Sequence, residues 1–141
     1  MKIIIKFIFF IFISFFLDIP KSIAQEKIKI GLIVPLSGEY KKIGESILNS
    51  TRLAINKIDN SQIQILPRDT RSNPGTTLRV AKELRELGVR VIIGPVFNKN
   101  LIYLEELNDV IFLSLTNKIA NNPQNVISAG INAISQINTI I

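Results

Sequence analysis

The side chains that could carry out chemistry in this sequence are hydroxyls, amides, carboxylates and amines, because the 141 residues include no cysteine and no histidine. Without cysteine there is no thiolate nucleophile and no disulfide. Without histidine the commonest general base and metal ligand is missing, which excludes a histidine-based hydrolytic triad and a histidine-bound zinc site. No other nucleophile and base stand at a recognisable spacing. We therefore predict that the protein is not an enzyme and that it uses no cofactor and no metal.

Phosphate-binding loops are also missing from the sequence. It contains neither a Gly-x-Gly-x-x-Gly pattern nor a Walker-type Gly-Lys-Ser/Thr loop. The turn at residues 35–39, Pro-Leu-Ser-Gly-Glu, has a single glycine and places Glu39 where a phosphate would need bare backbone amides. Dinucleotide binding remains an alternative on the grounds of fold alone.

The stretch at residues 69–100 shows which elements position these groups, because it contains a loop, a helix, a strand and a second loop in succession. An Asn-Pro-Gly turn precedes a helix whose apolar residues recur every three positions. These apolar residues are Leu78, Ala81, Leu84 and Leu87. Gly88 follows at the helix C-terminus, where a positive φ is wanted, and residues 89–93 form a β-branched run typical of a buried parallel strand. Gly94-Pro95 ends that strand, and ligands bind at the carboxyl ends of strands in open α/β sheets.

Strands and helices alternate along the rest of the chain as well. Strands are predicted at residues 27–36, 62–66, 110–113 and 125–128, and helices at residues 40–58, 100–108 and from Asn132 onward. The longest helix has a stripe of Ile43, Ile47, Thr51, Ala54, Ile55 and Ile58. Alternation with short connections indicates an α/β fold built on a parallel, doubly wound sheet with right-handed crossovers. The predicted strand order is 2-1-3-4-5.

The first 24 residues have the features of a targeting segment. Lys2 and Lys6 form a basic start, and residues 7–17 are almost all apolar. A Ser-Ile-Ala sequence that ends at Ala24 has the small-x-small pattern that a signal peptidase recognises. We predict a signal peptide at residues 1–24 with cleavage after Ala24. An uncleaved membrane anchor is the alternative, for which the apolar run is shorter than the ~20 residues that span a bilayer.

Net charge gives little support to a nucleic-acid partner. The formal charge of +6 comes from 17 basic and 11 acidic residues, and removal of residues 1–24 takes away three lysines and one aspartate and leaves +4. The remaining basic residues are dispersed on predicted helix faces and do not cluster with aromatic residues. We therefore predict no nucleic-acid partner.

Four segments in order carry a resemblance to a known family. They are residues 30–38 (IGLIVPLSG), Gly44 at the start of a long helix, Asp69 followed by Asn73-Pro74, and residues 92–95 (IIGP). With these segments the chain resembles the type I periplasmic binding proteins, in particular the leucine-binding group of solute-binding proteins. The segments LPRDT at 66–70, GPVF at 94–97 and SLTNK at 114–118 look most similar to the penicillin-binding protein activators.

The resemblance implies a function in ligand capture. Family members have two such lobes joined by a hinge, and the lobes close over a ligand held by loops at the strand ends. Carried over by position, the implied ligand-binding residues are Ser37, Asn98, Ser114, Thr116 and Asn117. The implied ligand is an amino acid or a similar small polar molecule, and the implied partner is a membrane ABC permease reached from the periplasm. The activator branch implies an alternative, a protein-interaction module with a vestigial cleft that regulates a cell-wall synthase.

The sequence departs from the amino-acid-binding pattern at the implied site. Asn98 and Lys99 stand where a serine usually follows the Gly-Pro turn. Ile43 stands where an aromatic residue often precedes the glycine, and Lys118 lies near the usual threonine.

Structural roles are alternatives for several residues of these loops. Ser37 and Ser114 could be loop formers at strand ends. Asp69 could brace its own loop by accepting backbone N–H bonds. Phe97 could be a packing residue instead of a platform for a ligand.

Chain length bears on the implied two-lobed architecture. A domain typically takes ~100–150 residues, so the 141 residues here suit a single lobe. We predict that residues 25–141 are the N-terminal lobe of a longer binding protein and that the sequence is truncated.

Overall fold

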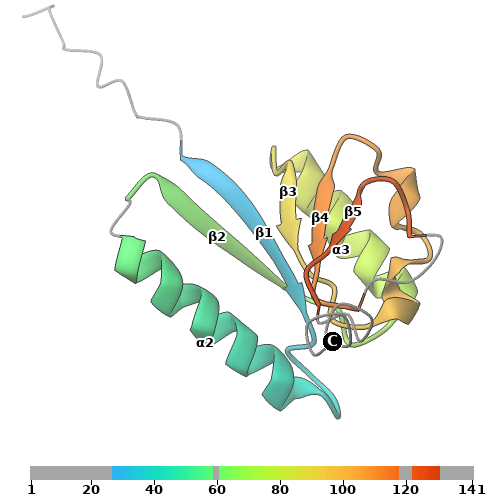
Figure 1. The fold of residues 1–141 in the computed structure, drawn as a ribbon, viewed down its shortest axis with the longest axis horizontal. Coiled ribbons are helices and arrows are strands. Elements are labelled where there is room, and N and C mark those ends of the chain that lie inside the picture. The colour runs from blue at the N-terminus through green and yellow to red at the C-terminus, as the bar shows by residue number, and fades with distance from the viewer. Residues whose placement is uncertain (1–26, 59–60, 118–121, 131–141) are drawn as a thin grey trace, which may run out of the picture.

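The computed structural model describes residues 27–58, 61–117 and 122–130. The elements, in which η marks a 3-10 helix, are β1 (Ile28–Val34), α2 (Lys41–Ile58), β2 (Ile63–Asp69), α3 (Pro74–Glu86), β3 (Val91–Ile93), η1 (Asn98–Leu101), η2 (Leu104–Glu106), β4 (Ile111–Ser114) and β5 (Val126–Ser128) (Figure 1). The predicted signal peptide at residues 1–24, Lys118 and the helix predicted from Asn132 lie outside the described residues.

The five strands form one sheet in the order β2-β1-β3-β4-β5, and every pair is parallel. The predicted fold class and strand order are therefore confirmed. The strands are short apolar runs rich in isoleucine and valine, which suit a parallel sheet. The chain moves from β1 outward to β2 through α2, and it then returns past β1 to β3 through α3. Because crossovers between parallel strands are right-handed, these opposite directions along the sheet place α2 and α3 on opposite faces (Figure 1).

The carboxyl ends of β1 and β3 form a topological switch point. The chain leaves β1 toward α2 on one face, and it leaves β3 toward η1, which packs against α3 on the other face. In open α/β sheets the crevice between two such strands is the usual place for a ligand.

The main core lies between the sheet and α3. Its buried side chains are Ile33, Val80, Ala81, Leu84, Val89, Ile92, Leu101, Leu104, Leu107, Val110, Phe112 and Val126. Gly31 lets α3 approach β1, because a Cβ at this position would lie 2.8 Å from Cδ1 of Leu84. The Asn73 side chain caps α3 by accepting a 2.9 Å hydrogen bond from the Thr76 N–H. Gly88 has the predicted positive φ, at +85°.

The other face of the sheet is covered only in part by the described residues. α2 contacts β1 and β2, and Gly44 is its buried residue. At β4 and β5, Ile111 and Ile127 are 48% and 56% exposed, although their strand neighbours Phe112 and Val126 are buried on the α3 side. None of the helices in the described ranges is long and apolar enough to cross a membrane.

Two predicted element boundaries are wrong for identifiable reasons. The helix predicted at residues 100–108 consists of the two short 3-10 helices η1 and η2, because leucines spaced by three residues fit a three-residue turn as well as an α-helical one. β2 continues past Pro67 to Asp69. It is an edge strand, and a proline is tolerated there because its missing N–H need not remove a ladder bond.

The predicted apolar stripes of both helices are only partly buried. Leu87 lies beyond the end of α3 and is 45% exposed. The buried positions of α3 are Thr77, Val80, Ala81 and Leu84. Ile43 and Ile58 of α2 are exposed, because α2 covers only the β1–β2 side of the sheet.

Candidate functional site

The loops that follow the strands meet at one edge of the sheet, which we call the carboxyl edge. It consists of residues 35–40, 70–73, 94–98 and 115–117, which follow β1, β2, β3 and β4. The five residues predicted to bind a ligand all lie in these loops or, for Ser114, at the end of β4. Parallel pairing explains this arrangement, because all strands end on the same side.

Asp69, the last residue of β2, holds the loop that follows β1. Its Oδ1 accepts hydrogen bonds from the N–H groups of Leu36 (2.8 Å) and Arg71 (2.9 Å), and its Oδ2 accepts one from the Ser37 hydroxyl (2.5 Å). The register of the two strands pairs Val34 with Asp69, so the loop after β1 emerges beside the carboxylate. Asp69 therefore acts as a brace, and the Ser37 hydroxyl is turned toward it.

The pKa of the Asp69 carboxyl lies below its ordinary value of 3.8. Partial burial raises the pKa, but the hydrogen bonds from Ser37, Arg71 and Leu36 together outweigh that effect, and the nearby Arg71 guanidinium adds attraction. The carboxylate is therefore charged at neutral pH and keeps the loop in place.

Two glycines permit close approaches of the backbone at the carboxyl edge. A Cβ at Gly44 would lie 1.8 Å from the Pro35 carbonyl oxygen, so glycine lets α2 begin directly against the end of β1. Gly94 has a φ of +105°, and a Cβ there would lie 2.2 Å from the Ile33 carbonyl oxygen. The Gly94–Pro95 peptide bond is cis. Both glycines belong to the segments that carry the resemblance, and both serve backbone packing.

Ser114 and Thr116 are brought together and are turned into the protein. Their hydroxyl oxygens are 2.8 Å apart, and the Ser114 hydroxyl lies 3.2 Å from the Pro95 carbonyl oxygen that it can donate to. Both residues are buried. The N–H groups of Ala129 and Gly130 donate to the carbonyls of Ser114 (2.8 Å) and Thr116 (3.1 Å). These contacts join the loop after β4 to the loops after β3 and β5.

An aromatic pair connects the loops on the two sides of the switch point. The ring centroids of Tyr40 and Phe97 are 4.7 Å apart and the rings are tilted by 59°, a geometry that aromatic quadrupoles favour. Sequence reasoning missed the role of Tyr40. The available signal was that Tyr40 and Phe97 each follow a strand closely and that the two strands are neighbours.

Asn98 and Asn117 are the exposed members of the predicted set. Asn98 is the first residue of η1, and Asn117 follows β4. Asn98 also lines a hollow of about 660 Å³ together with Lys99 and Tyr103. Within the part of the chain that the structure describes, no hydrogen bond joins Ser37, Asn98 and Asn117 to one another, and no group of three or more acidic side chains is placed to hold a metal ion.

A family model described as periplasmic binding protein matches residues 27–140. This range contains all the strands and the whole carboxyl edge. The chain belongs to the periplasmic binding protein family. The resemblance seen in four short segments is therefore confirmed, and family membership implies a binding role and a periplasmic location.

Solved structures similar to this periplasmic binding protein include two solute-binding proteins of ABC transporters. One, from R. palustris in complex with 4-hydroxybenzoate, is 25% identical with a TM-score of 0.60. The other, from Rhodopseudomonas palustris BisB5 in complex with 3,4-dihydroxybenzoic acid, is 28% identical with a TM-score of 0.60. Each comparison covers 64% of this chain and 27% of the solved chain.

The C-domain of LpoA from Haemophilus influenzae, a regulator of PBP1A, shares the fold at 22% identity and a TM-score of 0.61. That comparison covers 80% of this chain and 38% of the solved chain. This periplasmic binding protein thus spans much less than half the length of its structural relatives. The comparison with curated proteins gives no match.

Proposed function

We propose that residues 25–141 form the N-terminal lobe of a periplasmic solute-binding protein that delivers its ligand to a membrane ABC permease. The ligand binds at the carboxyl edge, beside the switch point between β1 and β3. The observation that carries this proposal is that hydrogen bonds hold the loops of the carboxyl edge in place. Asp69 holds the loop after β1, and the buried Ser114–Thr116 pair holds the loops after β3 and β4. Loops that are fixed before binding lose little entropy when a ligand arrives.

The proposal divides the five candidate residues by role. Asn98 and Asn117 contact the ligand, because an exposed amide offers both donors and an acceptor. Ser37, Ser114 and Thr116 position the loops through the hydrogen bonds described above.

The ligand class in this proposal is a small carboxylic acid with further polar groups, of which amino acids are one kind. The two similar solute-binding proteins support this class, because they are in complex with 4-hydroxybenzoate and 3,4-dihydroxybenzoic acid. A second lobe would complete the site by closing over the ligand.

Thermal unfolding of the full-length protein with a panel of amino acids and hydroxybenzoates tests the proposal. A ligand present at 100 times its Kd stabilises the folded state by ~2.7 kcal/mol and raises the Tm measurably. Asn98→Ala should weaken binding about tenfold by removing a hydrogen-bonding group from the site. Asn56→Ala, which removes an exposed amide from α2, should leave the response unchanged. A panel in which nothing stabilises the protein, or an equal loss in both variants, would contradict the proposal.

One observation favours a second candidate function, a protein-interaction module that regulates a cell-wall synthase. The hydroxyls of Ser114 and Thr116 bond to each other inside the protein, which leaves the carboxyl edge with fewer groups for a small ligand. The test is the rate of glycan polymerisation by a penicillin-binding synthase with and without the full-length protein. An increase in that rate, together with no response to the ligand panel, would favour this second function.

A further inference from the structure

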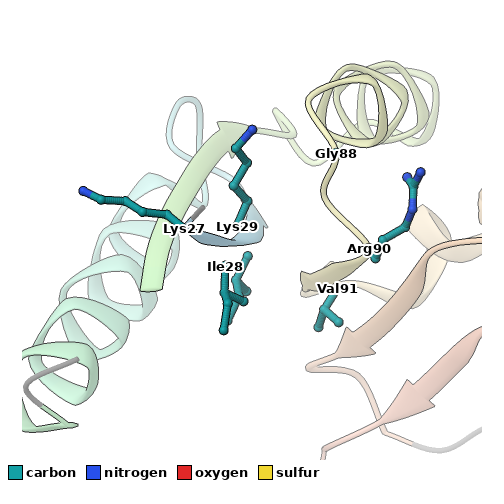
Figure 2. Close-up of a pocket in the computed structure, with 7 residues that line it drawn as sticks. Lys27, Ile28, Lys29, Gly88, Arg90 and Val91 are labelled. Atoms are coloured by element: carbon teal, nitrogen blue, oxygen red, sulfur yellow. The ribbon is translucent and has the colours of Figure 1, made fainter. Parts of the chain in front are cut away.

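The opposite edge of the sheet, where the strands begin, contains a notch between β1 and β3. Pairing of these strands starts at Ile30 and Val91, so the first two residues of β1 extend beyond β3. The resulting cavity of about 440 Å³ is lined by residues 27–30, Gly88, Arg90 and Val91 (Figure 2). We refer to it as the amino-edge notch. Its volume lies in the range of small-molecule sites, ~300–1,000 Å³.

The amino-edge notch carries positive charge and no carboxylate of its own, since three of its lining residues are basic and none is acidic. Lys29 Nζ donates a 2.9 Å hydrogen bond to the Leu87 carbonyl oxygen, which directs the ammonium without neutralising it. Arg90 shares the carboxylate of Asp109 with Arg85. The Arg90 Nη1 is 3.6 Å from Oδ2 of Asp109, whereas the Arg85 Nε is 2.8 Å from Oδ1 of Asp109. Positive charge therefore remains for an anion.

Aliphatic side chains form the other wall of the amino-edge notch. Figure 2 shows Ile28 and Val91 on the opposite side of the strands from Lys29 and Arg90. Ile28 is 57% exposed. The aliphatic side continues along the sheet, because Val91 pairs with Ile111, which is also exposed. A ligand that bends around the edge would meet cationic groups at one end and hydrocarbon at the other.

We propose that the amino-edge notch binds an anionic amphiphile, with a carboxylate head group on an acyl chain. The head group accepts charge-assisted hydrogen bonds from Lys29 and from the exposed Arg90, which lies on the same side of the strands. The acyl chain covers Ile28 and Val91 and removes their apolar surface from water. A second copy of the chain is a poorer occupant, because a two-fold contact over the notch would bring lysines against lysines.

Amide NMR spectra of the full chain, titrated with dodecanoate below its micellar concentration, test this inference. Dodecanoate should shift the amides of residues 28–30 and 88–91 in a saturable way. Dodecanol and dodecyltrimethylammonium, which have the same chain length, should bind at least tenfold more weakly. Lys29→Gln should raise the Kd for dodecanoate about tenfold, and Lys29→Arg should keep it near the wild-type value. Lys42→Gln removes an exposed lysine of α2 and serves as the matched control with no effect.

Equal affinity for the three probes would overturn recognition of the head group, and shifts confined to residues outside the notch would overturn the site. A dimer that persists in saturating dodecanoate, measured by analytical ultracentrifugation, would mean that a second copy covers the notch and would also refute the inference. Because the proposed solute binds at the carboxyl edge, failure of either site leaves the other to stand on its own test.

Discussion

Replacement of Asp69 by alanine should destabilise the protein by about 3 kcal/mol. The carboxylate accepts hydrogen bonds from Leu36, Arg71 and Ser37 at 2.5–2.9 Å, and a hydrogen bond contributes about 1 kcal/mol net. The Asp69 side chain is 28% exposed, so water replaces some of the lost hydrogen bonds. The larger free energies of hydrogen bonds to charged groups therefore do not apply. Asp69→Asn keeps one oxygen for the two N–H groups and should cost about 1 kcal/mol.

Urea unfolding followed by far-ultraviolet circular dichroism measures these differences, since the chain has no tryptophan to report by fluorescence. A double-mutant cycle of Asp69→Ala with Ser37→Ala isolates the hydrogen bond between the two side chains. The expected coupling free energy is about 1 kcal/mol.

The hydrogen bonds that Asp69 accepts also predict a pH dependence of stability. The pKa of Asp69 is lower in the folded protein than its ordinary value of 3.8, so the unfolded chain binds the proton more readily. The contribution of Asp69 to stability is therefore complete above the ordinary, unfolded pKa of 3.8 and is lost as the pH falls through the lower, folded pKa. Asp69→Asn should lose less stability than the wild type when the pH is lowered through this window.

Two results would refute this account of Asp69. One is an unfolding free energy for Asp69→Ala within about 0.5 kcal/mol of the wild type, which is the ordinary effect of a surface substitution. The other is a zero coupling free energy between Asp69 and Ser37, which would mean that the two side chains do not stabilise each other.

Other substitutions test the packing around the carboxyl edge by the same urea method. Gly94→Ala should destabilise the protein by about 3 kcal/mol or more, because the φ of +105° disfavours a side chain and the new Cβ would lie 2.2 Å from a backbone oxygen. Gly75→Ala is the control and should be neutral or slightly stabilising, because the nearest atom would lie 3.4 Å from its Cβ. Equal losses of stability in the two variants would contradict the claim that Gly94 is required for close backbone packing. Leu84→Ala should cost about 3 kcal/mol, because the side chain is completely buried, and a loss below about 1 kcal/mol would show that the core can collapse around the gap. Ser114→Ala should cost about 1–2 kcal/mol by leaving buried polar partners unsatisfied, and no loss would show that the hydroxyl pair does not hold the loops.

The arrangement of the strands could be predicted because it depends on patterns that lie close together in the sequence. Each strand is a short apolar run bounded by turn formers, and the handedness of the connections then permits few strand orders. The leucines at 101, 104 and 107 were misread as an α-helix, because their spacing does not distinguish a 3-10 helix from an α-helix. The exposure of Ile58 was missed for a different reason, since no pattern in α2 shows how much of the sheet it covers.

The contacts of the candidate site were harder to predict because they join distant residues. Ser37 was selected by resemblance, but its hydrogen bond to Asp69 depends on the register of β1 against β2. The contact of Tyr40 with Phe97 depends on β1 and β3 being neighbours. Sequence reasoning placed these loops at the carboxyl ends of the strands, where the structure has them. It could not tell which of their side chains form hydrogen bonds within the protein.

Binding at the carboxyl edge is the central claim, and amide NMR of the full-length protein tests it most directly. The ligand that gives the largest thermal stabilisation would be titrated in while residue-resolved shifts are followed. We predict saturable shifts at residues 37–40, 97–98 and 117, with little change at residues 28–30 and 88–91. Shifts that leave the carboxyl edge unchanged, or no saturable shift with any member of the panel, would contradict the claim that this edge of the sheet holds the solute.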